Sequence, residues 1–225
     1  MTQQLRLKDV PSWHDVLKLW CFLEEQYKAD KNSYNLRNLC LFGLLAFCGL
    51  RISEVLDLEK SNINFADEII VIRQKKKKGE AVREVIIADQ LKPYLEQYVQ
   101  NCDSKLFTIS QRGARDLIYR LTKKVLGRRI RPHAFRHAFA IRLLDKTRNI
   151  EVVRRLLGHR YYSTVKIYLD FTVRDIFYSE PKIKTIYGFT WPPNFAMISN
   201  ATWLLWTYAI CLDVFAIYVK KDSYI

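Results

Sequence analysis

The chain has 225 residues, which is enough for one large domain or for a domain with an appendage. It contains 37 Lys and Arg against 23 Asp and Glu, giving a formal net charge of +14. A field of that sign suits a polyanion such as nucleic acid, or an acidic membrane surface. Hydrophobic residues make up 49% of the sequence, which excludes a disordered basic tail and predicts a packed core.

The five cysteines show neither a CxxC pair nor the spacing of metal ligands, so no metal and no other cofactor is predicted. Cys40 and Cys48 lie within the apolar run LCLFGLLAFCG, where a buried, reduced thiol is expected. The first residues, MTQQLRLKDVPSWHD, lack the apolar core of a signal peptide. Together these features favour a reducing cytoplasm as the location.

The N-terminal part of the chain predicts two helices. Residues 11–29 begin with Ser12 as N-cap and Asp15 three residues later, and then show helical apolar spacing. Residues 34–48 predict a second helix that is apolar nearly all round, which is typical of a central helix. Gly49 is expected to end it, because glycine readily adopts the left-handed conformation found at helix ends.

A small sheet is predicted next, after a short third helix that Ser53 is expected to cap. Residues 62–74 and 81–88 carry β-branched residues in strand-length runs on either side of the basic turn KKKKGE. This pattern predicts an antiparallel sheet of two or three strands. Helical spacing then returns, in residues 89–101, 109–127, 131–147, 149–158 and 163–171.

The stretch RPHAFRHAF (131–139) predicts a helix that carries basic side chains. Pro132 suits a first helical position, because its missing N–H would be unpaired there anyway. His133 and Arg136 are three residues apart and share a helical face, where two donors could hold an anion such as a phosphate. His137 follows Arg136 directly, faces a different side and is expected to be a packing histidine. On this stretch alone, a solvated basic helix explains the pattern equally well.

Three more stretches place polar residues where a substrate could meet them. CGLRISEVLDL puts Arg51 just after a core helix, and KKKKGEAVR puts lysines at a hairpin tip. LLGHRYYSTVKIYLDF ends a helix at Gly158, exposes His159 and places Tyr168 nine residues later. Each stretch also has an ordinary structural explanation: an exposed arginine near a helix start, a solvated turn, and a core tyrosine on an amphipathic helix.

Taken together, the order and spacing of these stretches resemble the tyrosine recombinase (phage integrase) family, including its Xer-like and archaeal virus members. The resemblance rests on GLRISEVLDL, KGEAVR, RPHAFRHAFA and LLGHRYYSTVKIY, and covers about residues 35–170. It implies a catalytic-domain fold that is mainly α-helical with a small antiparallel β-sheet. It also implies a site-specific DNA recombinase or integrase that cleaves and rejoins DNA through a 3′-phosphotyrosyl intermediate.

The resemblance implies a role for each matching residue. Tyr168 would attack the scissile phosphate, and covalent capture would conserve the bond energy for rejoining. Arg51 and Arg136 would clamp the non-bridging oxygens, because guanidinium forks suit phosphate and stay charged. Such preorganised charge is usually the largest catalytic contribution.

The remaining matches imply supporting chemistry. His133 resembles the general base or proton-holding partner of the tyrosine, and His159 resembles the second hydrogen-bond donor to the phosphate. Lys78 in KGEAVR fits the lysine that protonates the leaving 5′-oxygen, although any of the four lysines of that run could take this register. Glu54 resembles the acid that supports the first arginine. The residues expected to contact DNA are Lys75, Lys76, Lys77 and Arg131.

The chain departs from the family pattern before Arg51. Only 50 residues precede it, enough for the first helices of a catalytic domain but not for the N-terminal core-binding domain that completes a clamp around DNA. Residues 1–180 are therefore expected to form the catalytic domain, as a stand-alone domain, as a fragment, or with a partner that supplies the rest. The other expected partners are double-stranded DNA and further copies of the chain assembled on it.

Residues 181–225 form an aromatic tail that differs in composition from the basic body. They hold three of the five tryptophans and four lysines against two aspartates, which leaves a charge of +12 for residues 1–180. The apolar stretch 201–219 nearly has the length of a membrane span, but Asp213 near its centre opposes insertion by roughly 2.5–3.5 kcal/mol. A helix packed on its own or a neighbouring subunit is favoured over membrane association. A sequence of recent or non-functional origin is the third alternative.

Two other functions fit parts of the pattern. A type IB topoisomerase shares the arginine–lysine–tyrosine chemistry, but the HxxR word and the spacing from LLGH to the tyrosine resemble recombinases more closely. A DNA-binding remnant that occupies recombination sites without cutting is the non-enzymatic alternative, because the expected clamp is incomplete.

Overall fold

The computed structural model describes residues 9–76, 79–159 and 161–169, and within residues 74–81 it describes only the backbone of the strands. These residues form a mainly helical body with a small antiparallel sheet, which confirms the predicted fold class. The helices are α1 (Trp13–Ala29), α2 (Ser33–Ala46), α3 (Ile52–Leu56), the 3-10 turn η2 (Lys60–Asn62), α4 (Lys92–Gln100), α5 (Gln111–Leu126), α6 (Pro132–Thr147), α7 (Ile150–Leu157) and α8 (Tyr162–Lys166).

Local sequence signals explain where several helices begin. The predicted capping box starts α1, since Ser12 Oγ accepts the Asp15 N–H at 3.1 Å and the Asp15 carboxylate accepts the Ser12 N–H. The prediction that Ser53 caps the third helix is wrong. Arg51 holds the N-cap position of α3, because the Glu54 carboxylate accepts the Arg51 N–H at 2.8 Å and starts the helix two residues earlier than predicted.

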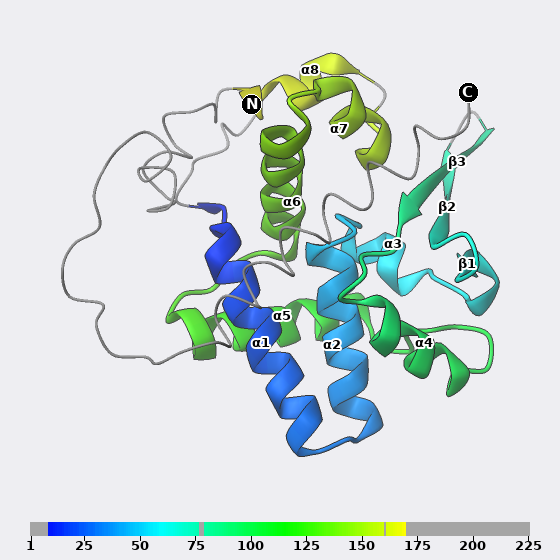
Figure 1. Cartoon of the computed structure of the whole chain (residues 1–225), viewed down its shortest axis with the longest axis vertical. Coiled ribbons are helices and arrows are strands. Elements are labelled where there is room, and N and C mark those ends of the chain that lie inside the picture. The colour runs from blue at the N-terminus through cyan, green and yellow to red at the C-terminus, as the bar shows by residue number, and fades with distance from the viewer. Residues whose placement is uncertain (1–8, 77–78, 160, 170–225) are drawn as a thin grey trace, which may run out of the picture. The chain divides into compact units, whose positions relative to one another are not determined.

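Helix α2 forms the centre of the body, as its apolar sequence predicts. It lies side by side with α1 and also contacts α3, α4 and α6 (Figure 1). Phe42 of α2 meets Phe135 of α6 edge to face, with ring centroids 5.2 Å apart, and both side chains are fully buried. This packing fixes the position of α6, the helix predicted to carry His133 and Arg136.

A second and smaller apolar cluster lies where α6, α7 and α8 meet. Its buried members are Ala140, Val153, Leu157, Val165 and Tyr168. The cluster is separate from the main core, which extends from α1 to the first turns of α6 and includes the sheet. Tyr168, just after α8, is therefore held by a small group of side chains.

The sheet has the strand order β1 (Ile63–Asn64), β2 (Ile69–Lys76), β3 (Gly79–Ile86), with both pairs antiparallel. Ile72 of β2 pairs with Arg83 of β3, and Ile70 pairs with Val85. Side chains two residues apart on a strand share a face, so Arg83 points to the same side as the buried Val85. That side is the helical body, where β3 contacts α7.

Two sequence-based expectations concern residues beyond this description. The aromatic tail 181–225, with its apolar stretch 201–219, lies outside the described residues. Across residues 9–169 as described, no helix combines the length and hydropathy needed to cross a membrane.

Candidate active site

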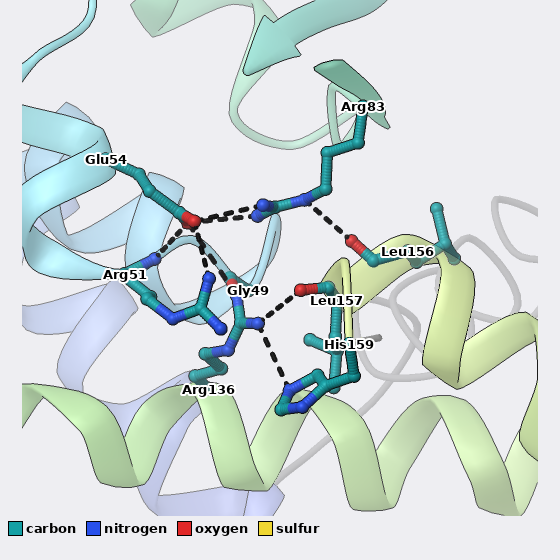
Figure 2. A network of polar contacts seen from close by, with 8 residues as sticks. All are labelled: Gly49, Arg51, Glu54, Arg83, Arg136, Leu156, Leu157 and His159. Carbon is teal, nitrogen blue, oxygen red and sulfur yellow. Dashed lines mark hydrogen bonds and ion pairs between the residues drawn. The ribbon is translucent and has the colours of Figure 1, made fainter. Parts of the chain in front are cut away.

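The carboxylate of Glu54 on α3 is the centre of a cluster of arginines (Figure 2). Its side chain is only 6% exposed. Arg51 donates from Nη1 to Glu54 Oε1 at 2.7 Å. Arg83 donates from both terminal nitrogens, to the two carboxylate oxygens at 3.0 and 2.9 Å. Arg136 adds a longer ion pair at 3.7 Å, so one buried carboxylate holds together three guanidinium groups from distant parts of the sequence.

These contacts keep Glu54 ionised. Burial by itself would raise the pKa of the carboxyl, but the hydrogen bonds and charge of Arg83, the Arg51 N–H and the charge of Arg136 lower the pKa to about 2. The carboxylate therefore remains negative at neutral pH and well into the acid range. The negative charge of Glu54 offsets part of the repulsion among the arginines. The arginines can therefore lie close together, as they must if they are to bind one phosphate.

Replacing Glu54 by glutamine should make the free energy of unfolding depend less on pH in the acid range. The folded pKa of about 2 lies below the ordinary value of 4.5, so the stabilisation is complete above pH 4.5 and is lost as the pH falls toward 2. The shift corresponds to about 3 kcal/mol in the free energy of unfolding. Urea unfolding of both proteins between pH 2 and pH 6 measures it. Glu25→Gln, at an exposed position of α1, is the matched control, and a Glu54→Gln acid limb parallel to that control would contradict the assignment.

Arg136 on α6 is the most deeply buried arginine of the cluster, with a side chain 1% exposed. Its Nη1 donates to the Gly49 carbonyl at 2.7 Å, and its Nη2 donates to the Leu157 carbonyl at 2.5 Å. Its Nε is buried and has no hydrogen-bond partner among the described residues. Burial and the charge of Arg51 lower the pKa of the guanidinium to about 9, which leaves it charged at neutral pH. A buried donor without a partner costs about 1–3 kcal/mol, so an acceptor that reached Nε would stabilise this arginine.

Two glycines in the left-handed conformation shape the backbone around Arg136. Gly49, at φ 62°, follows α2 by three residues, and a β-carbon there would lie 2.4 Å from the ring of Phe139. Gly158, at φ 65°, ends α7 as predicted, and a β-carbon there would lie 2.8 Å from Arg83 Cδ. Both positions therefore require glycine for conformation and for space.

His159, directly after Gly158, lies against Arg136. The His159 Nε2 is 3.3 Å from Arg136 Nη2. Because an arginine can only donate, Nε2 accepts and the ring proton of neutral His159 is assigned to Nδ1. Desolvation and the charges of Arg136 and Arg51 lower the pKa of His159 to about 4, which agrees with a neutral ring. A neutral ring with Nδ1–H can donate one hydrogen bond to an anion.

Tyr168 is buried, 2% exposed, and its hydroxyl lies 3.0 Å from Nδ1 of His137. Desolvation raises the pKa of the phenol to about 12, although the charges of Arg136 and Arg51 act in the opposite direction. The alternative tyrosines differ in environment. Tyr161 is 60% exposed, and Tyr162 is 56% exposed and donates to Glu151.

His137 was expected to be a packing histidine on a different side of the helix from Arg136, and the structure places it against two candidate site residues. Its ring lies edge to face on His133, with centroids 4.6 Å apart, as well as against Tyr168. Residues four apart on a helix share a face, and α8 brings Tyr168 to that same face. His133 itself is exposed at the start of α6, and desolvation and the charges of Arg136 and Arg51 lower its pKa.

Sequence reasoning also missed a role for Arg83. Besides its two bonds to Glu54, it donates from Nε to the Leu156 carbonyl at 3.1 Å, and its side chain is 10% exposed (Figure 2). It thereby joins β3 to α3 and to the end of α7. The sequence did contain a signal for this role. Arg83 ends the stretch KGEAVR and lies at an inward-facing position of β3.

The predicted DNA-contacting residues lie at two places. Arg131 is the exposed N-cap of α6. Lys75 and Lys76 end β2, where they pair with Glu80 and Gly79 of β3. Lys77 and Lys78 lie outside the described residues. Within the described ranges, no group of three His, Cys, Asp or Glu side chains is placed to hold a metal ion.

The fold and this cluster agree with comparisons to known proteins. Residues 16–174 match the phage integrase family, which is most of the chain. The chain therefore belongs to the phage integrase family. It is 35% identical over 144 residues to a tyrosine recombinase of Pseudothermotoga lettingae, covering 60% of this chain and 50% of the relative. It is 31% identical over 163 residues to the tyrosine recombinase XerA of Thermococcus onnurineus, and this match covers 68% of this chain and 57% of the relative. The chain thus spans about half the length of these relatives.

Solved structures show the same fold. The crystal structure of XerA recombinase superposes with a TM-score of 0.64 at 22% identity, covering 81% of this chain and 66% of that chain. XerH site-specific recombinase bound to difH substrate, in a pre-cleavage complex, gives a TM-score of 0.58 at 22% identity. This match covers 72% of this chain and 50% of that chain.

Proposed function

We propose that this chain is the catalytic part of a site-specific DNA recombinase that cleaves and rejoins DNA through a 3′-phosphotyrosyl intermediate. The observation that supports it most is the convergence of Arg51 and Arg136 on one carboxylate, with His159 against Arg136, within electrostatic reach of Tyr168. These residues come from four separate parts of the sequence. A cluster of cationic and neutral donors beside a phenol suits a phosphodiester and a covalent phosphotyrosine.

In the proposed reaction, the Tyr168 oxygen gives its proton to a neighbouring histidine and forms a bond to phosphorus, while the bond from phosphorus to the 5′-oxygen breaks. Arg51 and the unpartnered Nε of Arg136 would neutralise the non-bridging oxygens. His159 would add a hydrogen bond from Nδ1. One of the four hairpin lysines, with Lys78 as the first choice, would protonate the leaving 5′-oxygen. Rejoining would run through the same steps in reverse, and no cofactor is required.

The decisive experiment captures the covalent intermediate and does not require a defined target site. The full chain is incubated with a pool of nicked suicide duplexes whose central sequence is randomised. DNA that stays attached to protein after denaturation is recovered and sequenced. Enrichment of covalently attached sequences is the expected result. DNA binding without any covalent product would instead support the remnant that occupies sites without cutting, and continuous relaxation of supercoiled plasmid without strand exchange would support the topoisomerase alternative.

DNA binding should weaken steeply with salt, because the charge of +14 would act mainly on phosphates. Each neutralised phosphate should contribute about −0.9 to the slope of log K against log salt. Arg131→Gln should make this slope about one unit shallower for any duplex sequence. Lys18→Gln, at an exposed position of α1, is the control and should leave the slope unchanged. Fluorescence anisotropy with a scrambled duplex at several salt concentrations measures both, and equal slopes for the two variants would contradict DNA contact by Arg131.

We also propose double-stranded DNA and further copies of the chain as partners. In this proposal residues 1–180 are the catalytic domain, and the tail 181–225 docks on its own or a neighbouring subunit. A cytoplasmic location is proposed because Cys40 and Cys48 are buried, free thiols. Burial raises the pKa of the Cys48 thiol to about 12, so the thiol stays protonated and unreactive.

A further inference from the structure

The histidine that meets the hydroxyl of Tyr168 is His137, not His133. The Nδ1 of His137 lies 3.0 Å from the phenol oxygen, within hydrogen-bond distance, and the two rings are 5.7 Å apart between centroids. It is the one hydrogen bond found for this hydroxyl among the described residues. A nucleophile that is 2% exposed has little access to water as an alternative proton acceptor.

The direction of this hydrogen bond follows from the charges around it. Desolvation lowers the pKa of His137 to about 4, and the charges of His133, Arg136 and His159 act in the same direction. Tyr168 keeps its proton, because its pKa is raised to about 12. A neutral imidazole with its proton on Nε2 therefore accepts the Tyr168 O–H at Nδ1. The lone pair that a general base needs is already aimed at the proton it would remove.

We propose that His137 accepts the proton of Tyr168 during DNA cleavage, an inference that rests on the proposed recombinase function. As the phenol oxygen bonds to phosphorus, the phenol proton moves to His137 Nδ1. The bond between phosphorus and the 5′-oxygen breaks, and that oxygen takes a proton from the hairpin lysine. In the rejoining step the 5′-hydroxyl attacks, and His137 returns its proton to the departing phenol oxygen.

The surroundings of His137 couple this step to substrate binding. His133 and Arg136 face it from α6, His159 from the turn after α7, and Tyr168 from the end of α8. Without DNA, the positive charges among these groups oppose protonation of His137. A phosphate bound to the arginine cluster brings negative charge to the same place and offsets that opposition. His137 is thus a weak base in the free protein and a stronger one when a phosphate is in position.

His137→Asn separates proton transfer from hydrogen bonding. The asparagine amide reaches the position of Nδ1 and can accept the same hydrogen bond, but it cannot take a proton. We expect His137→Asn to bind DNA as the wild type does and to cleave about 10²–10⁴-fold more slowly near neutral pH. Its cleavage rate should climb steadily with pH up to pH 10, as ionisation of the phenol replaces the missing base. The wild-type rate should level off at lower pH.

The measurement is single-turnover formation of covalent adduct on a duplex recovered from the suicide pool, at several pH values, with filter binding in parallel. His14→Asn, at an exposed position of α1, is the matched control and should behave as the wild type. His133→Asn tests the rival histidine. A His137→Asn rate within threefold of the wild type, or a loss that is the same at every pH, would overturn the proposal. So would a pH-dependent loss found in His133→Asn alone.

Two features keep the result interpretable. If the wild type forms no adduct, the proposed function fails, whereas normal cleavage by His137→Asn alone refutes only the role of His137. Incorporation of difluorotyrosine, a more acidic phenol, at position 168 provides a second measurement. It should restore most of the lost rate to His137→Asn but not to Arg136→Lys, and restoration of neither would also count against proton transfer to His137.

Discussion

Tyr168→Phe is expected to abolish the covalent protein–DNA adduct while leaving the affinity for duplex DNA within about twofold, since one hydroxyl adds little beside many phosphate contacts. Phenylalanine preserves the packing of the ring among Val153, Leu157 and Val165. The fold should therefore lose only the hydrogen bond to His137, about 0.5–1.5 kcal/mol in the free energy of unfolding. Denaturing gels of suicide-substrate reactions measure the adduct, and thermal unfolding checks the fold.

Two neighbouring tyrosines provide the controls for that experiment. Tyr161 and Tyr162 are exposed, and the hydroxyl of Tyr162 is bonded to Glu151. Tyr161→Phe and Tyr162→Phe should form adduct at the wild-type rate. Adduct formation that survives in Tyr168→Phe and disappears in Tyr162→Phe would move the nucleophile to position 162.

Arg136→Lys should slow cleavage about 10²–10³-fold, even though the charge is kept. The guanidinium donates to the carbonyls of Gly49 and Leu157 with its two terminal nitrogens, and its buried Nε has no partner among the described residues. A lysine ammonium cannot span both carbonyls and also present a donor in the position of Nε. The loss should appear in the rate of adduct formation at saturating DNA, with binding changed only a few fold.

The matched control for Arg136→Lys is Arg148→Lys, just after the last residue of α6. Arg148 has a side chain that is 69% exposed, so the same chemical change there removes no buried contact. Circular dichroism of both variants establishes that each is folded before cleavage rates are compared. Cleavage by Arg136→Lys at the rate of Arg148→Lys would refute the phosphate-clamp role.

Features that depend on neighbouring residues in the sequence could be predicted correctly. The capping box of Ser12 and Asp15 and the glycine that ends α7 act within a few residues, so their patterns are readable directly. The same holds for the two main strands, whose β-branched runs flank the basic turn. The start of α3 was misjudged because Glu54, rather than Ser53, supplies the hydrogen bond that begins the helix.

Contacts between distant residues could not be predicted from local patterns. Helical spacing places His137 on the side of α6 away from Arg136, but only the packing of α8 puts Tyr168 on that side. Arg83 is likewise 29 residues from Glu54, and its role depends on how the hairpin folds onto α3. The family resemblance placed Arg51, Arg136 and His159 in one site and implied that Glu54 supports Arg51. It did not show that the same carboxylate also holds Arg83 and Arg136.

The apolar interior is divided into two clusters, so opening of the structure around Tyr168 and opening around the arginines should require different free energies. Tyr168 is packed with Val153, Leu157 and Val165 in the small cluster, whereas Glu54 sits beside a much larger core. Proteins open in cooperative units, and a unit that buries few side chains opens at a lower free energy than the whole fold. The unit that contains Tyr168 should therefore open at a lower free energy than the part of the fold that holds the arginines. Loss of the hydrogen bond between Tyr168 and His137 and loss of the arginine cluster are then two separate events, and the first should come at the lower free energy.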